Sequence, residues 1–133
     1  MATEVEARKG SGVQTAFKVL VTLAAVAVLV QAVTAGQLMS GAAGGAHGMG
    51  STAVHVLGLL QLIAAVLIWR PGRGPGWPAL ASLVALLLGF VQSAMGGSGV
   101  ISVHVPLGMA LFGLTVWLTV WAWTRRAPAG RPA

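Results

Sequence analysis

The chain has 133 residues, of which 56% are hydrophobic and only 8% are charged, whereas roughly a quarter of the residues of a soluble domain are charged. A soluble core of this size would need a polar surface that this composition cannot supply. The absence of cysteine excludes disulfides, thiolate metal sites, iron–sulfur clusters and covalently attached c-type haem. The only acids, Glu4 and Glu6, lie near the N-terminus, so no carboxylate inside a membrane span is available to relay protons.

The charged residues are segregated along the chain. No Lys, Arg, Asp or Glu occurs from residue 19 to 69, or from residue 74 to 124. Because one bilayer crossing takes about 20 residues of helix, each of these stretches holds two crossings and a connection. We therefore predict an all-α, integral membrane four-helix bundle that runs up-down-up-down. The transmembrane domain is expected at residues 14–124, with spans at about 15–38, 51–69, 77–95 and 101–124.

The net charge of +6 does not indicate nucleic-acid binding, because all eight basic residues fall on one side of a four-crossing topology. They precede the first span, lie between the second and third, or follow the last. Cytoplasmic loops carry such an excess of Lys and Arg. We therefore expect N-in and C-in orientation, with residues 1–13 as a disordered cytoplasmic tail and residues 125–133 as a basic cytoplasmic tail. The lipid bilayer is the expected partner.

The first apolar stretch has an alternative interpretation as a cleaved signal peptide. Arg8 and Lys9 precede it, and the segment 33–35 near its end resembles a small-residue cleavage site. The stretch is, however, longer than the apolar region of an ordinary signal peptide. We expect it to be retained as the first helix.

Two histidines are the main candidates for chemistry. His55 lies about four residues into the second span and His104 about three residues into the fourth, and both spans run inward from the outer face. At 1.5 Å rise per residue, the two imidazoles lie at closely similar depth in the outer leaflet. Two neutral imidazoles on such helices could ligate the two faces of a b-type haem in an apolar bundle. The alternative is that each is an interfacial residue without a cofactor.

Glycines and glutamines extend this candidate site. Gly58 and Gly108 follow the histidines by about one helical turn and would leave room for a porphyrin face. Gln31 and Gln92 lie near the outer ends of the first and third spans. They could bond a cofactor edge or an axial imidazole, or they could simply hydrogen-bond between helices. The order Gln, glycine turn, His, Gly occurs in both halves of the chain, which suggests an internal repeat.

His47 belongs to the glycine-rich stretch of residues 40–50, which has no stable local preference and is expected to be the outer loop. We expect His47 to be a solvated loop residue. The alternatives are a contact to a haem propionate or a labile third ligand. A mononuclear metal site is disfavoured, because only His47 could join His55 and His104.

Five features occur in order along the chain: Gln31…Gly36, His55-Val-Leu-Gly58, a Pro/Gly inner turn, Gln92, and His104-Val-Pro-Leu-Gly108. This order resembles, over about residues 17–124, a family of small bacterial four-helix membrane proteins of unknown function. More distantly the chain resembles one half of haem A synthase, a four-helix bundle whose second and fourth helices each supply a haem-ligating histidine. The resemblance implies that His55 and His104 are the axial iron ligands of haem b in a bacterial cytoplasmic membrane. Haem A synthase has two such bundles and an acidic residue tied to its oxidation chemistry, and this chain has neither.

The sequence thus predicts a b-type haem-binding membrane protein that transfers electrons, with a quinol or a membrane redox protein as partner and with no catalytic residues. The alternative is a cofactor-free accessory or scaffold subunit that packs its small-residue faces against larger membrane proteins. A transporter component is disfavoured, because the spans contain no charged residue to couple to an ion.

Overall fold

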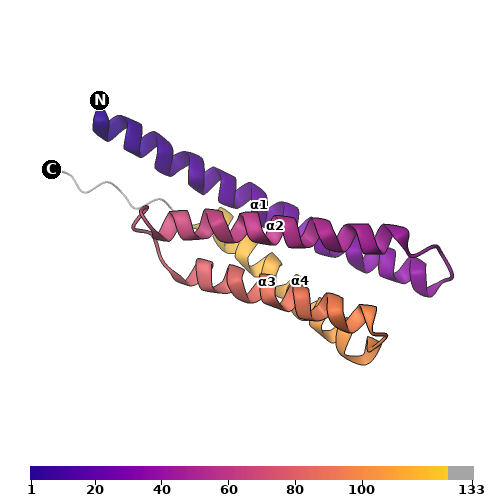
Figure 1. The fold of residues 1–133 in the computed structure, drawn as a ribbon. Helices are drawn as coiled ribbons and strands as arrows, with labels where there is room; N and C mark the ends of the chain where they lie inside the picture. Colours follow the sequence, from indigo (N-terminus) through magenta and orange to yellow (C-terminus); the bar gives the residue numbers. More distant parts are fainter. Residues whose placement is uncertain (126–133) are drawn as a thin grey trace.

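The computed structural model describes residues 1–125 and has four α-helices and no strand in that range. Each helix contains a segment long and apolar enough to cross a membrane, as expected of a multi-pass membrane protein. The predicted all-helical class with four apolar helices is therefore confirmed. The helices are α1 (Ala2–Met39), α2 (Gly45–Trp69), α3 (Trp77–Gly97) and α4 (Ile101–Thr124) (Figure 1).

Each helix packs against two of the others. Helix α1 packs on α2 and α4, and α3 packs on the same two helices. Helices α2 and α4 therefore face each other across a diagonal of the bundle. Within the described range, the two helices of either diagonal pair make no close backbone contact. A residue of α2 can consequently meet a residue of α4 only through side chains that reach the centre of the bundle.

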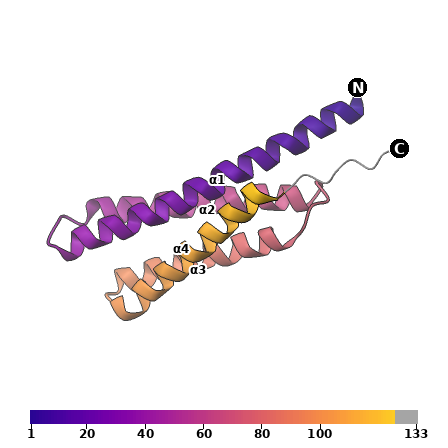
Figure 2. The same cartoon turned by 180° about the vertical axis from the view of Figure 1, so that it is seen from behind.

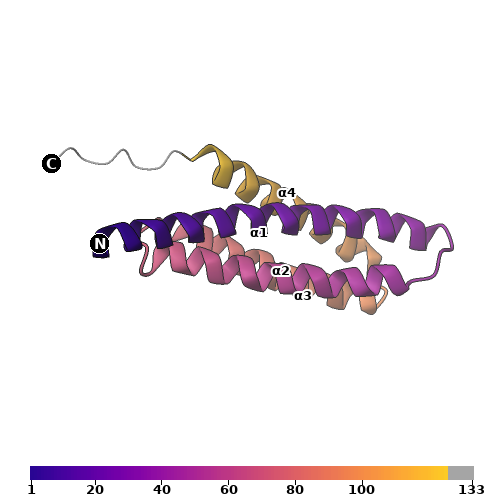
Figure 3. The ribbon, with the colours of Figure 1, turned by 90° about the horizontal axis from the view of Figure 1, so that it is seen from above.

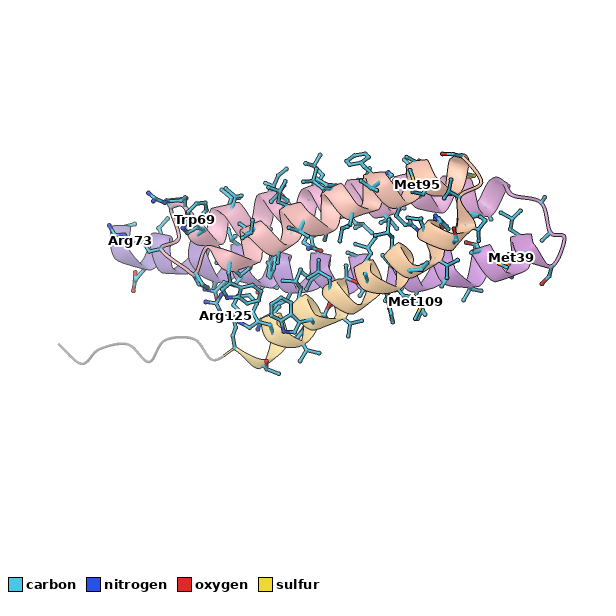
Figure 4. The ribbon with its side chains drawn as sticks, turned by 90° about the horizontal axis from the view of Figure 1, so that it is seen from below. Met39, Trp69, Arg73, Met95, Met109 and Arg125 are labelled. Atoms are coloured by element: carbon cyan, nitrogen blue, oxygen red, sulfur yellow. The ribbon has the colours of Figure 1, made fainter. Side chains whose placement is uncertain are left out.

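The two ends of the bundle differ in character. Figures 1 and 2 show the α1–α2 and α3–α4 connections at one end, which we call the hairpin end, and the N-terminus with the α2–α3 connection at the other, which we call the basic end. In Figure 4, Met39 and Met95 lie toward the hairpin end, whereas Arg73 and Arg125 lie at the basic end. Glycines with positive φ, Gly41 at 93° and Gly99 at 77°, allow the sharp turns at the hairpin end.

Two helices begin earlier than the sequence predicts. The expected disordered tail over residues 1–13 is wrong, because α1 is helical from Ala2. That segment is rich in Ala, Glu, Arg and Lys, which favour helix. Helix α2 begins at Gly45 rather than near residue 51, so His47 lies on a helix and not in a loop. Of the predicted basic tail, residues 126–133 lie outside the described range.

The apolar core is concentrated away from the hairpin end. The main cluster joins Phe17, Val21, Ala64, Ala65, Ile68, Ala79, Leu118 and Ala122. A smaller cluster of Val28, Ala85 and Leu111 lies next to it along the bundle. Beyond Val28, Ala64, Ala85 and Leu111 toward the hairpin end, none of the described apolar side chains is buried. The hairpin end is therefore the less tightly packed part of the bundle. The side view in Figure 3 shows α1 and α2 extending along the bundle to that end.

Aromatic and basic side chains gather at the basic end (Figure 4). The Trp77 ring centre lies 4.7 Å from that of Trp117 and 4.6 Å from that of Trp121. The Arg125 guanidinium lies 4.9 Å from the Trp121 ring centre, within the range of a cation–π contact. Trp123 Nε1 donates to Thr22 Oγ1 at 3.0 Å. These tryptophans fix the packing of α4 on its neighbours and combine apolar rings with polar partners, as interfacial tryptophans do.

Candidate functional site

A cavity of about 370 Å³ opens at the hairpin end and is walled by all four helices. Its volume lies in the range of roughly 300–1,000 Å³ that small-molecule and cofactor sites occupy. The polar part of the wall comes from both halves of the chain and includes Gln31, His47, Ser51, Ser93 and His104. Gly44, Gly48, Gly96 and Gly97 contribute wall without side chains.

His104 reaches this cavity from α4 and is held by α3. Its Nδ1 lies 2.8 Å from the backbone oxygen of Gln92. Because a carbonyl oxygen only accepts, Nδ1 carries the hydrogen, and Nε2 of the neutral ring carries the lone pair. The Gln92 amide nitrogen lies 3.4 Å from Nε2, which is long for an N–H donor. The ring packs directly against the backbone of Gly96, where an added Cβ would be 2.6 Å from His104 Nδ1.

His47 reaches the same cavity from α2 and is held by α1. Its Nδ1 lies 3.1 Å from Thr34 Oγ1, and that hydroxyl is also 3.1 Å from the backbone oxygen of Gln31. The hydroxyl has one hydrogen, which can go either to Gln31 or to His47 Nδ1, so the contact is compatible with either tautomer of His47. The tautomer with Nδ1–H leaves the lone pair on Nε2. Among the described residues, none bonds His47 Nε2. The His47 backbone oxygen also accepts from Gln31 Nε2 at 3.0 Å, which ties the first turn of α2 to α1.

The two imidazoles meet across the diagonal of the bundle. The ring centres of His47 and His104 are 6.0 Å apart, and the ring planes make an angle of 74°. Without a ligand this is an edge-to-face contact of ordinary spacing. Both rings line the 370 Å³ cavity, so the structure brings together one histidine from each half of the chain.

His55 occupies a different place. Its Nε2 lies 3.3 Å from Ser93 Oγ, and its ring stacks on Phe90 at 4.3 Å with 14° between the planes. It packs beside Gly89, where an added Cβ would be 3.5 Å from the ring. The space next to it measures about 10 Å³, which is room for about one water molecule. His55 therefore does not share a cavity with His104, and its contacts on α3 lie about one helical turn deeper.

The two glycines of the predicted site, Gly58 and Gly108, leave room for side chains of α3 to pack against them. A Cβ on Gly58 would lie 3.3 Å from Leu86 Cδ1, and a Cβ on Gly108 would lie 3.2 Å from Gln92 Nε2. Each glycine thus permits a close helix–helix contact. The predicted glutamines also have partners on the next helix, since Gln31 bonds α2 and Gln92 bonds α4. Gln31 Oε1 and Cδ fill the space that a Cβ on Gly50 would occupy.

A buried polar contact lies deeper in the bundle. Gln61, which is 1% exposed, donates from Nε2 to Ser82 Oγ at 3.0 Å. Its Oε1 is buried and has no partner among the described residues. This contact joins α2 to α3 and lies beside the small space next to His55. The contact is an interhelical hydrogen bond in an apolar environment.

The donor set at the hairpin end fits a haem better than a bare metal ion. In the described part of the chain, no three His, Cys, Asp or Glu side chains cluster as ligands for an ion. A protein-bound metal ion ordinarily needs three or four protein ligands. A haem needs only axial ligands from the protein, because its porphyrin supplies the others. His47 and His104, which are both held through Nδ1 and line one glycine-walled cavity, are the candidates for such ligands.

Thr34 was not identified as a contributor from the sequence, and His47 was expected to be a solvated loop residue, with a propionate contact or a labile third ligand only as alternatives. Thr34 follows Gln31 by three residues, which places both on one face of α1, and this spacing is the signal that could have pointed to a partner there. No family model, curated protein or solved structure matches this chain. The function proposed for the chain therefore rests on its own residues.

Proposed function

We propose that this protein is a multi-pass protein of a bacterial cytoplasmic membrane that binds b-type haem at the hairpin end and transfers electrons. The observation that carries the proposal is the 370 Å³ cavity lined by His104, whose Nδ1 is bonded to the Gln92 carbonyl. A metal-ligating histidine almost always donates its other ring N–H to such an acceptor.

The proposed orientation places both termini in the cytoplasm, with four alternating crossings. Arg70, Arg73 and Arg125 belong to the basic end, whereas residues 40–44 and 98–100 of the hairpin-end connections carry no charge. Positive charge concentrates on the cytoplasmic side of membrane proteins, and tryptophans concentrate at the interfaces. The haem site then lies in the outer leaflet.

Each part of the chain has a defined task toward the haem. His104 would hold the haem iron from α4, and a second histidine would hold it from α2, which carries both His47 and the predicted ligand His55. The Gln92 carbonyl orients the His104 ring. Leu38 and Ile101 in the cavity wall limit the access of water. Bound haem supplies a one-electron change between ferric and ferrous iron.

The role that follows is electron transfer rather than catalysis. None of the spans contains a carboxylate or a thiol, and the proposal assigns the histidines to the haem rather than to acid–base chemistry on a substrate. A site in the outer leaflet suits exchange with a membrane quinol or with a redox protein at the outer surface. We propose these as the two partner classes and assign no catalytic residue.

A second candidate function is that of a cofactor-free scaffold subunit. The observation that favours it is that His55 and Gln61 are both bonded by serines of α3, which is sufficient reason for polar residues inside the spans. Half-exposed apolar residues such as Leu29, Leu87 and Val120 face either lipid or a partner protein. A scaffold subunit would bind no haem and would therefore be colourless.

An optical spectrum separates the two candidates. The protein is expressed with haem supplied, purified in detergent, and measured before and after reduction with dithionite. The haem proposal predicts a Soret band and sharp low-spin α and β bands on reduction, which His104→Ala loses. A colourless protein that also fails to take up added haem would contradict the haem proposal and favour the scaffold function.

A further inference from the structure

We infer that the second axial ligand, opposite His104, is His47 and not His55. This inference rests on the proposed haem function, which it deepens by naming the pair of nitrogens. The observations that carry it are the hydrogen bonds of the three histidines, the distance between two of the rings, and a structural repeat of the two hairpins.

The hydrogen bonds divide the histidines into two kinds. His47 and His104 are both held through Nδ1, by Thr34 Oγ1 at 3.1 Å and by the Gln92 carbonyl at 2.8 Å. His104 carries its lone pair on Nε2, with the Gln92 amide nitrogen 3.4 Å away, and His47 carries it there in the tautomer with Nδ1–H. His55 is held in the opposite way, because its Nε2 is the nitrogen that contacts Ser93 at 3.3 Å. Ligation through His55 Nε2 would require that contact to break, as ligation through His104 Nε2 would displace the Gln92 amide at 3.4 Å. His47 Nε2 has no bonded partner among the described residues.

The distance between His47 and His104 matches a shared metal. When one nitrogen of each ring bonds a metal ion at about 2.0–2.1 Å, the two ring centres are separated by roughly 6 Å. The observed separation is 6.0 Å. The rings meet edge to face with 74° between their planes, so each would have to turn its Nε2 toward an iron shared between the diagonal helices α2 and α4.

His55 is poorly placed for the same iron. It follows His47 by eight residues on α2, which moves it about 12 Å along the helix axis and roughly 80° around it. Its ring stacks on Phe90 of α3, and the adjoining space is only about 10 Å³. A porphyrin next to His55 would have to displace residues of α3.

The hairpins also repeat one arrangement, and His47 is the counterpart of His104 in it. In the first hairpin, Gln31 of α1 bonds the His47 backbone of α2 and its amide occupies the space over Gly50. In the second, the residue order is the same but the bond differs: the backbone carbonyl of Gln92 of α3 accepts from His104 Nδ1 of α4, and the Gln92 amide lies beside Gly108. The repeat is thus Gln, His and a glycine three or four residues later. His55 has no such glutamine partner.

The test uses the full-length protein in detergent with His47→Ala, His55→Ala and His104→Ala as matched variants. The readouts are the optical spectrum of the reduced protein, the electron paramagnetic resonance spectrum of the ferric protein, and haem affinity by titration with hemin. We expect His47→Ala and His104→Ala to lose the low-spin spectrum and at least tenfold in affinity. We expect His55→Ala to keep both.

Added imidazole distinguishes a missing ligand from a damaged fold. In His47→Ala, free imidazole should restore the low-spin spectrum, because it can enter the space left by the side chain. A low-spin spectrum that is lost in His55→Ala and kept in His47→Ala would overturn the inference, as would its retention in both variants. A wild-type protein that binds no haem would instead overturn the proposed function itself.

Discussion

The His104 imidazole lies so close to Gly96 that a Cβ on that glycine would stand 2.6 Å from Nδ1. Real Cβ atoms do not approach a neighbour so closely, so only glycine allows this placement of the ring. The same Nδ1 bonds the Gln92 carbonyl one turn earlier on α3. Gly96 therefore fixes both the position of the ring and the nitrogen that faces the cavity.

Gly96→Ala should displace His104 and weaken haem binding at least tenfold, because the added methyl group occupies the position of the ring. Gly97→Ala is the matched control, since a Cβ on Gly97 meets nothing within 4 Å. Both changes alter helix propensity alike, by about 1 kcal/mol. Haem titration of the two variants measures the difference. Equal hemin affinities of the two variants would show that the contact with Gly96 does not position His104 for haem binding.

Thr34→Val should weaken haem binding by about 10- to 100-fold, the usual effect of removing an outer hydrogen-bond partner of a ligating histidine. The valine keeps the shape of the side chain and removes only the hydroxyl that bonds His47 Nδ1. Thr52→Val, at an exposed position of α2, is the control. If hemin binds both variants with wild-type affinity, Thr34 does not orient a ligand.

Ser82→Ala should destabilise the bundle by about 0.6–2 kcal/mol, the range of interhelical hydrogen bonds in membranes. The reason is that buried Gln61 loses the hydroxyl to which it donates at 3.0 Å. Adding Gln61→Leu to Ser82→Ala should recover stability, because no buried amide is then left without a partner. Unfolding in mixed detergent measures both variants. A double variant less stable than Ser82→Ala would contradict this account of the contact.

Single cysteines introduced into this cysteine-free chain test its orientation. Ala43→Cys, in the α1–α2 connection, should react with a membrane-impermeant maleimide in intact cells. Pro75→Cys, in the α2–α3 connection, should react only after the membrane is made permeable. Both positions are exposed. The reverse pattern of labelling would place the hairpin end in the cytoplasm.

The fold was largely predictable because the bilayer imposes strong rules. A chain segment in hydrocarbon must satisfy its own backbone, so long stretches without charge become helices. The two stretches at residues 19–69 and 74–124 accordingly contain most of the helical bundle. The glycine-rich start of α2 was not predictable in this way, because its local preference is weak. It is helical where Gln31 and Thr34 of α1 hold His47, and those contacts join residues far apart in the sequence.

The sequence identifies the candidate histidines but gives neither their relative depth nor their direction, because α2 begins at Gly45 and the ring of His55 packs on Phe90, deeper than the His104 contacts. Counting residues from the ends of the predicted spans places His55 and His104 near one level of the bundle. It does not give the rotation of each helix about its axis, which is set by packing. His55 turns toward Ser93 and Phe90 of α3, whereas His104 turns toward the cavity that also contains His47. The direction of each ring therefore depends on neighbours that no local pattern reveals.

Titration of the purified, haem-free protein with hemin, followed by reduction with dithionite, tests the central claim most directly. We predict saturable uptake and sharp reduced α and β bands in the wild-type protein, with both lost in His104→Ala. Absence of saturable uptake by a well-folded wild-type protein, or an unchanged spectrum in His104→Ala, would contradict the claim that the hairpin end is a haem site.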